Sequence, residues 1–176
     1  MQKISFRKAT LSDQNLLKIW FAKPHVQEYW DNSKEMWKNV VSYLNGEKIL
    51  YDYWIGLLEN IPFCLIITSD LSENDPRAPG SDNDFLTYID PKETTWTVDF
   101  MIGEEAFLKR GLSYLALQKF IDWQKEVKNF VVDPEISNTR AIHCYEKAGF
   151  EKIATFIPKE GYFSGLEHVI MKKGKT

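Results

Sequence analysis

Hydrophobic residues recur along the first half of the chain at two different spacings, which predict both strands and helices. Ile4 and Phe6 alternate with polar neighbours, which predicts a short first strand. Two segments with helical spacing follow, and residues that stop helices bound them, Pro24 after the first and Asn45-Gly46 after the second. The stripes expected to face the core are Leu16, Leu17, Ile19 and Trp20 in the first helix and Met36, Trp37, Val40, Val41 and Leu44 in the second.

The rest of the chain predicts further strands and helices. A hairpin is expected from residues 51–58 and 63–69, joined by turn residues at 59–62. The later expected elements are a strand at 94–102, a helix from Leu112 to an inward-facing Trp123, a strand at 130–132, a helix from Asn138 and closing strands at 151–156 and 166–171. Hairpins together with a strand–helix–strand crossover predict an α/β fold with a mixed sheet and helices on both faces.

Residues 70–93 carry seven acidic and two basic side chains, and prolines and a glycine interrupt regular structure there. We therefore expect a surface loop. Its negative charge would suit a lid over a polycationic substrate. A solvated insertion without such a role is the equal alternative.

The overall composition sets broad limits on function. A length of 176 residues suits one domain with a sizeable core, and we expect residues 1–176 to form that domain. A formal net charge of −3 argues against binding to nucleic acids or anionic membranes. Cys64 and Cys144 lack disulfide or metal-site spacing, and both are expected to be buried thiols. Since no apolar leader follows Met1, a cytoplasmic protein without a metal is the simplest expectation.

The most informative stretch runs from Asp133 to Phe150. A short apolar strand ends at Asp133-Pro134, because proline cannot donate to a strand ladder. Helical spacing then places Tyr145 on the same face as small residues, and Gly149 stands where helices commonly end. From these residues alone, Tyr145 is interpreted as a core tyrosine and Gly149 as a helix cap.

This stretch resembles the C-terminal half of the GNAT superfamily of acetyl-CoA-dependent N-acyltransferases, most closely the aminoglycoside 6′-N-acetyltransferases. The Asp-Pro pair, the Ser-Asn before the helix and the sequence Arg-Ala-Ile-His-Cys-Tyr-Glu-Lys-Ala-Gly-Phe have counterparts in that family. The resemblance covers nearly the whole chain, including residues 25–30, 54–62 and 97–103, and is weakest in the acidic loop at 70–93. It implies the GNAT fold, whose mixed sheet is mostly antiparallel.

The resemblance also implies a binding site for acetyl-CoA around residues 108–113. Gly111 matches the central glycine of the family's pyrophosphate loop, where the first N–H groups of a helix receive the anion. Leu108 replaces the usual Arg or Gln, and Ser113 replaces the last glycine, which narrows the space for a phosphate. The residues expected to hold the cosubstrate are Lys109, Arg110, Gly111, Leu112, Ser113, the backbone of Phe100, Met101 and Ile102, and the side chain of Asn138.

By the same resemblance, three side chains carry out the transfer. Tyr145 would protonate the departing thiolate, a role that suits a phenol. Asp99 and Asp133 would attract the substrate ammonium and accept its proton. An acid inside an apolar strand needs a partner or a function, which favours a catalytic role for Asp99. Asp133 before a proline is equally well explained as a turn-forming residue.

The expected reaction is direct transfer of an acetyl group, within a ternary complex, to a primary amine of a small cationic acceptor, which the resemblance implies to be an aminoglycoside. Tyr29 and Trp30, two aromatic residues beside an acid, are expected to contact that acceptor. Two alternatives stay open: acylation of hydroxylysine in siderophore synthesis, and a catalytically silent sensor of acyl-CoA. The expected assembly is a monomer or a homodimer.

Overall fold

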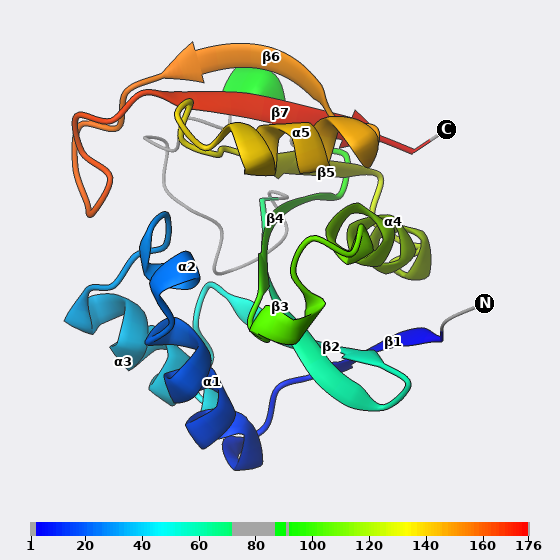
Figure 1. The fold of residues 1–176 in the computed structure, drawn as a ribbon. Coiled ribbons are helices and arrows are strands. Elements are labelled where there is room, and N and C mark those ends of the chain that lie inside the picture. Colours follow the sequence, from blue (N-terminus) through cyan, green and yellow to red (C-terminus); the bar gives the residue numbers. More distant parts are fainter. Residues whose placement is uncertain (1–2, 72–86, 91, 176) are drawn as a thin grey trace.

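The computed structural model of the chain describes residues 3–71, 87–90 and 92–175. A seven-stranded sheet runs through the molecule in the order β1-β2-β3-β4-β5-β7-β6 (Figure 1). Neighbouring strands are antiparallel, except that β4 and β5 are parallel. The predicted α/β fold with a mixed, mostly antiparallel sheet is therefore confirmed.

The order of elements along the chain follows the predicted order. The strands are β1 (Ile4–Lys8), β2 (Asp52–Leu58), β3 (Ile61–Asp70), β4 (Thr95–Ile102), β5 (Asn129–Val132), β6 (Glu151–Phe156) and β7 (His168–Gly174). The helices are α1 (Gln14–Phe21), α2 (Pro24–Gln27), α3 (Lys34–Leu44), α4 (Leu112–Trp123) and α5 (Thr139–Lys147), with 3₁₀ turns η1 (Leu11–Asp13) and η3 (Glu105–Phe107). The short helix α2 was not predicted, and it forms because Pro24 occupies the first helical turn, where proline is well tolerated. None of the helices in the described ranges is long and apolar enough to span a membrane.

Helices cover both faces of the sheet because its central strands are apolar on both sides. On β2, the adjacent residues Tyr53 and Trp54 point to opposite faces and join different core clusters. The cluster around Trp54 includes residues of α4 and α5, whereas the cluster around Tyr53 includes residues of α1, α2 and α3. The prediction of helices on both faces is confirmed.

The parallel strands β4 and β5 pair over a short distance and then separate. Thr95–Thr97 pair with Asn129–Val131, and among the described residues this pairing goes no further. β4 nevertheless continues along β3 as far as Ile102. In Figure 1, β5, β7, β6 and α5 consequently lie above this separation, and β1–β3 with α1–α3 lie below it. The later part of β4 and the end of β5 therefore face a space that no sheet pairing fills.

Two predicted core residues and one turn differ from expectation. Ile19 and Trp123 were expected to face inward, but they are 58% and 47% exposed. Ile19 lies on the outer side of α1, and Trp123 lies at the end of α4, where it stacks on Phe6 with one side open to solvent. The hairpin turn is tighter than predicted, because Glu59 and Asn60 adopt positive φ angles of 49° and 68° and close it alone.

The predicted acidic loop at 70–93 lies largely outside the described residues, which omit 72–86 and 91. Its two described ends are attached to the fold. The backbone N–H of Leu71 donates to the carbonyl of Thr95 at 2.8 Å. Leu71 and Ile89 are both buried, in one small cluster with Val131 of β5.

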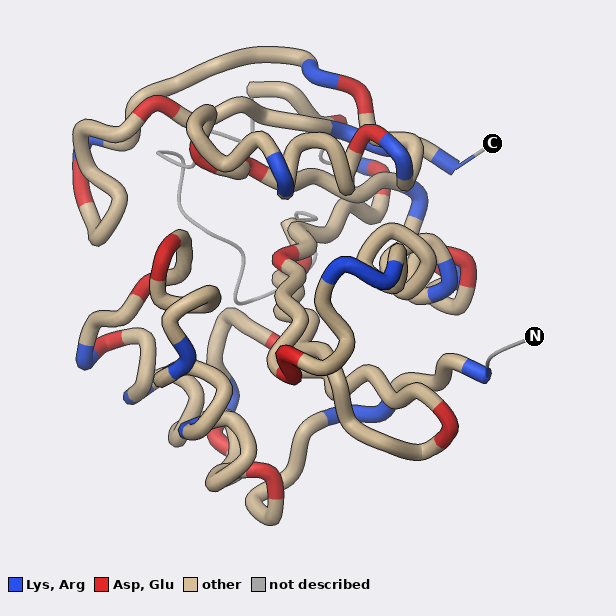
Figure 2. Tube along the Cα trace, in the orientation of Figure 1, with Lys and Arg blue, Asp and Glu red and all other residues tan. Residues whose placement is uncertain are grey.

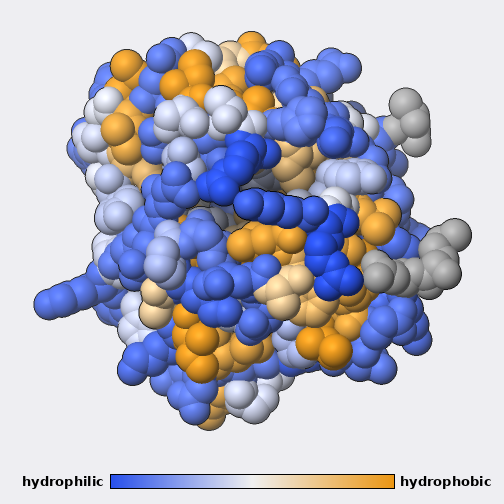
Figure 3. All heavy atoms as spheres, viewed as in Figure 1, coloured by the Kyte–Doolittle hydropathy of each residue, from blue (hydrophilic) through white to orange (hydrophobic). Residues whose placement is uncertain are grey.

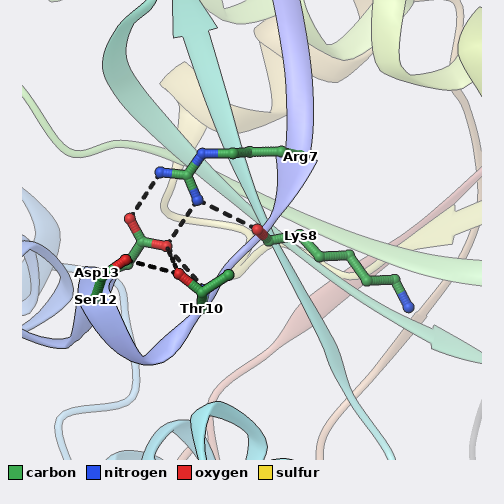
Figure 4. A network of polar contacts seen from close by, with 5 residues as sticks. All are labelled: Arg7, Lys8, Thr10, Ser12 and Asp13. Carbon is green, nitrogen blue, oxygen red and sulfur yellow. Dashed lines mark hydrogen bonds and ion pairs between the residues drawn. The ribbon is translucent and has the colours of Figure 1, made fainter.

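A network of polar contacts anchors β1 to the start of α1 (Figure 4). Arg7 donates two hydrogen bonds to the carboxylate of Asp13, each 2.7 Å long. The backbone N–H of Thr10 donates to the same carboxylate at 2.8 Å. The hydrogen bond from Arg7 outweighs the effect of burial and, with the one from Thr10, holds the pKa of Asp13 below its usual value.

We expect Asp13→Asn to lower the free energy of unfolding near pH 7 by about 2 kcal/mol, because it removes the anion that both Arg7 and Thr10 contact. The pKa of Asp13 is lowered in the folded state, so its ionised form stabilises the fold above the unfolded value of 3.8. That stabilisation disappears as the pH falls through the folded value. Denaturant titrations near pH 7 and at about pH 2.5 should therefore show a large difference from wild type in the first and a small one in the second.

The exposed pair between Glu35 and Lys38, 3.7 Å apart, supplies a control. Glu35→Gln should change the stability by less than about 0.5 kcal/mol. If Asp13→Asn lowered the free energy of unfolding equally at both pH values, the charge of Asp13 would not be what stabilises the junction between β1 and α1.

Candidate active site

A cavity of about 240 Å³ lies where β4 and β5 separate. Segments that are distant in the sequence line it: the chain after α2, strands β2 to β4, the chain after β5, helix α5 and the start of β7. The lining residues that the sequence had singled out are Tyr29, Trp30, Asp99, Phe100, Asp133, Asn138 and Tyr145. The expected catalytic and acceptor residues thus meet around one space.

The register of the sheet builds one wall of this cavity. Tyr53 of β2 pairs with Ile67 of β3, and Ile67 pairs with Asp99 of β4. Cross-strand partners point to the same face, so these three side chains form a row on the side of the sheet that α1–α3 cover. Tyr51, just before β2, also lines the cavity. The carboxyl group of Asp99 therefore lies at the end of a row that begins with the side chains of Tyr53 and Ile67.

The surroundings of Asp99 disfavour its ionised form. Burial, followed by the negative charge of Asp133, raises the pKa of Asp99 to about 7, and the charge of His168 acts in the opposite direction. A carboxyl with such a pKa exchanges protons readily near neutral pH. It is therefore suited to accept a proton from an ammonium group.

Asp133 follows β5 directly and contacts His168 at the start of β7. Nδ1 of His168 lies 2.6 Å from the backbone oxygen of Asp133 and 3.4 Å from its carboxylate Oδ2. Burial by itself lowers the pKa of His168, but the hydrogen bonds and charge of Asp133, with the charge of Glu135, outweigh it and raise the pKa above 6.5. No sequence motif marks His168, because its partner lies 35 residues earlier.

Tyr145 reaches the cavity from α5, and it is also part of the core. Its side chain is 5% exposed, and its ring meets that of Phe150 edge-on with centroids 5.5 Å apart. Burial and the charge of Asp99 raise the pKa of Tyr145 well above 10, although a hydrogen bond with the backbone of Phe100 opposes them. The hydroxyl group therefore keeps its proton at ordinary pH and is available as a proton donor beside β4.

Tyr29 and Trp30 line the cavity from the segment after α2. The Tyr29 hydroxyl donates to the backbone oxygen of Ser137 at 3.5 Å, and Arg140 of α5 donates to Glu28 at 2.8 Å. These contacts tie this segment to the beginning of α5. The face shown in Figure 3 is hollowed near its centre, and hydrophilic residues gather there.

The loop before α4 has the geometry of an anion site. Gly111 is the N-cap residue of this twelve-residue helix, has a φ of 69° and provides no side-chain cap for the first N–H groups. Lys109, also with a positive φ of 59°, and Arg110 are exposed, and Figure 2 shows this loop as a basic segment. The side chain of Leu112 is buried, so only its backbone could contact a ligand. Ser113 is half-buried in the first turn.

The end of β4 offers backbone groups rather than side chains. The side chains of Met101 and Ile102 are buried, so only the backbone of these two residues could contact a ligand. Nε2 of His25 lies 2.8 Å from the carbonyl oxygen of Ile102 and holds the strand end in place. Asn138 caps α5 by accepting from Ala141 N–H at 3.1 Å, so its amide nitrogen is the part that remains for a ligand.

Residues 9–157 of the chain match the acetyltransferase (GNAT) domain family. The chain belongs to the GNAT acetyltransferase family. The aminoglycoside N(6′)-acetyltransferase type 1 of Klebsiella pneumoniae is 24% identical over an alignment of 181 positions, and the alignment covers 90% of this chain and 79% of that protein. A kanamycin resistance protein of Rhizobium radiobacter is 34% identical over 67 residues, or 36% of this chain and 62% of that protein.

Solved structures agree with this GNAT assignment. The aminoglycoside N(6′)-acetyltransferase of Legionella pneumophila superposes with a TM-score of 0.80 at 28% identity, covering 98% of this chain and 92% of that one. The aminoglycoside acetyltransferase AAC(6′)-Ib, solved in complex with coenzyme A and kanamycin, superposes with a TM-score of 0.75 at 23% identity and shares the fold, with coverage of 98% and 95%. The protein is thus a GNAT N-acetyltransferase, and acetyl-CoA is its acetyl donor.

Several residues of this GNAT cavity were not identified from the sequence. Besides His168, they include Asp31, Tyr51, Tyr53 and Phe163. The Tyr53 hydroxyl is buried and makes no hydrogen bond within the described part of the chain. Asp31 directly follows Trp30 in the chain, whereas strand register and the return of the chain bring the other four residues to the cavity.

Two other kinds of site, a cysteine nucleophile and a metal centre, find less support in this GNAT domain. Cys144 is half-buried rather than buried as predicted, since it lies at the edge of the inward face of α5. Burial raises the pKa of Cys144 to about 11, which disfavours a thiolate nucleophile. Within the ranges that the structure describes, no group of three or more His, Cys, Asp and Glu side chains could hold a metal ion.

Proposed function

We propose that this GNAT enzyme acetylates a primary amine of a small polycationic acceptor, and that the acceptor is an aminoglycoside modified at its 6′-amine. The observation that carries the proposal is the placement of Asp99, Asp133 and Tyr145 around one cavity at the separation of β4 and β5. We also propose that residues 1–176 act as one catalytic domain.

The charge of the cavity supports a cationic acceptor. Four acidic residues line it, Asp31, Asp99, Asp133 and Glu135, and the described lining includes no Lys or Arg. Aromatic side chains of Tyr29, Trp30, Tyr51, Tyr53 and Phe163 surround these acids. Carboxylates beside aromatic faces are a favourable environment for ammonium groups. Relatives with aminoglycoside 6′-N-acetyltransferase activity in their names make this class of acceptor the natural candidate.

In the proposed reaction, Asp99 accepts a proton from the acceptor ammonium, directly or through water, which frees the nitrogen lone pair for attack. The nitrogen then forms a bond to the acetyl carbonyl carbon, and the bond between that carbon and sulfur breaks. Within Phe100–Ile102, the backbone N–H groups that face away from β3 stabilise the developing oxyanion. Tyr145 donates its proton to the departing sulfur and regains a proton from the acetylated nitrogen, directly or through water, so that a neutral amide and the free thiol are formed. Asp133 holds the ammonium in place by its charge.

The residues around Gly111 would hold the diphosphate of the donor. The uncapped N–H groups at the start of α4 and the exposed side chains of Lys109 and Arg110 fit an anion of that kind. Leu112 and Ser113 would contribute backbone N–H groups. The free amide nitrogen of Asn138 would donate to the pantetheine chain. The start of α4 would then hold the diphosphate of acetyl-CoA, and Asn138 at the start of α5 would hold its pantetheine chain. With the donor held beside the acceptor, we propose direct transfer within a ternary complex.

The cavity argues against hydroxylysine as the acceptor. A free amino acid carries a carboxylate, which needs a cationic or N–H-rich partner. Its described lining holds four acids and a single histidine, so a carboxylate would be repelled. A silent acyl-CoA sensor also fits poorly, because binding the donor requires neither Asp99 nor Asp133.

Thiol release from acetyl-CoA measures the proposed specificity. We expect kcat/KM with an aminoglycoside to exceed that with hydroxylysine by about 100-fold or more, with simple polyamines between them. Equal or greater turnover of hydroxylysine would overturn the proposal. Tight binding of acetyl-CoA without turnover of any acceptor would favour the sensor.

A further inference from the structure

The first residues of β7 are fastened to the segment that carries Asp133. The two segments face each other in antiparallel fashion, and an isolated bridge joins Glu135 to His168. Two backbone hydrogen bonds flank that bridge, from Val169 to Pro134 at 3.0 Å and from Ile136 to Glu167 at 2.9 Å. The backbone thus fixes His168 against the turn that follows β5.

The ring nitrogens of His168 have different roles. Nδ1 lies 2.6 Å from the carbonyl oxygen of Asp133, which can only accept, so Nδ1 carries a hydrogen. The carboxylate Oδ2 of the same residue is 3.4 Å away. Nε2 is buried and has no partner among the described residues. Within the described residues, this imidazole therefore hydrogen-bonds only to Asp133.

The neighbours of His168 favour its cationic form. Asp133 and Glu135 come from the segment after β5, and Asp99 interacts with it from β4. The rings of Phe156 on β6 and Phe163 before β7 pack beside it, with centroids 5.7 and 5.4 Å away, and add no charge. The described lining includes no Lys or Arg, and the imidazolium is a cation that it places beside these carboxylates.

We propose that His168 is a positioning residue for acetyl transfer: it fixes Asp133 through Nδ1, and its positive charge keeps Asp133 ionised, so that Asp99 is the carboxyl group that takes the proton. This proposal rests on the proposed roles of Asp99 and Asp133. It explains why two neighbouring acids, Asp133 and Asp99, have different roles. A permanently charged Asp133 attracts the ammonium and, by repulsion, makes Asp99 the stronger base.

The protonation of His168 can be measured directly, without any acceptor. The chain has three histidines, so three imidazole C–H signals are expected in NMR spectra, and the signal that His168→Asn removes belongs to His168. We expect its titration midpoint to lie above 6.5 in wild type and to fall by about one pH unit in Asp133→Asn. A midpoint below 6.5, or one that Asp133→Asn leaves unchanged, would overturn the proposal. This measurement tests the pairing of His168 with Asp133 even if no acceptor in the panel is turned over.

Kinetics test the consequence for catalysis. His168→Asn keeps an N–H group at the position of Nδ1 but removes the charge, whereas His168→Leu removes both. In His168→Asn, the rise of kcat with pH should move upward by about one pH unit, while acetyl-CoA binding stays within about two-fold of wild type. His168→Leu should lose kcat at every pH. A pH profile of His168→Asn that coincides with the wild-type profile would contradict the proposed effect of charge.

Discussion

Replacing Asp99 by asparagine should lower kcat by about 100-fold or more, since it removes the group that accepts the ammonium proton. The pKa of Asp99, raised to about 7 by burial and by Asp133, also predicts the wild-type pH dependence. Activity should increase as the pH rises through about 7, because only the ionised carboxylate can accept a proton. Steady-state rates between about pH 5.5 and 9 with a saturating acceptor measure both effects.

Stability measurements separate this loss from misfolding. The folded pKa of Asp99 lies above its unfolded value of 3.8, so the folded state opposes ionisation and wild type loses stability as the pH rises between these values. Asp99→Asn lacks this penalty, and its melting temperature relative to wild type should therefore be higher at about pH 8 than at about pH 4. The exposed Asp122 supplies a matched control, since Asp122→Asn makes the same chemical change outside the cavity. Unchanged kcat in Asp99→Asn would place the proton acceptor elsewhere.

Replacing Tyr145 by phenylalanine should lower kcat by about 100-fold while leaving the dissociation constant of acetyl-CoA within about three-fold of wild type. The substitution removes the proton donor and keeps the ring that packs against Phe150. Because burial and Asp99 raise the pKa of Tyr145 well above 10, the wild-type hydroxyl should show no titration of its own below about pH 10. Single-turnover rates and calorimetric binding of acetyl-CoA measure the two quantities separately.

Tyr43→Phe is the matched control for this prediction. Tyr43 packs in the core beside Tyr53, with ring centroids 5.0 Å apart, and does not line the cavity. It should retain wild-type kcat. If Tyr145→Phe turns over acceptor as fast as the control at every pH, sulfur is protonated by another group, and Tyr145 is a core residue as its sequence neighbourhood alone indicated.

The order of strands and helices was predictable because each element has a local signal. Alternation identified β4, and the proline after Asp133 marked the end of β5. The exposed sides of Ile19 and Trp123 were missed, because helical spacing gives the axis of an apolar stripe but not its width. Packing against a particular neighbour decides which borderline residues are covered.

The candidate site was predictable only in part. Resemblance to a family gave the roles of Asp99, Asp133 and Tyr145. The local sequence supported a functional role only for Asp99, an acid in an apolar strand, because Asp133 and Tyr145 are explained as well by a turn and by the core. Tyr53 lines the cavity only because the registers of β2, β3 and β4 align it with Asp99. His168 meets Asp133 only after the chain returns along β7, 35 residues later. Such contacts depend on the pairing of strands that are distant in the sequence, and the spacing of residues along the chain does not reveal that pairing.

The central claim is that this cavity presents a cationic amine to acetyl-CoA. Two aminoglycosides that differ only at the 6′ position, one with an amine and one with a hydroxyl group, test it most directly. Mass spectrometry after incubation with acetyl-CoA should show one added acetyl group on the amine and none on the hydroxyl compound, with one thiol released for each acetyl transferred. Equal acetylation of both compounds, or of neither while a non-cationic amine is acetylated, would contradict this account.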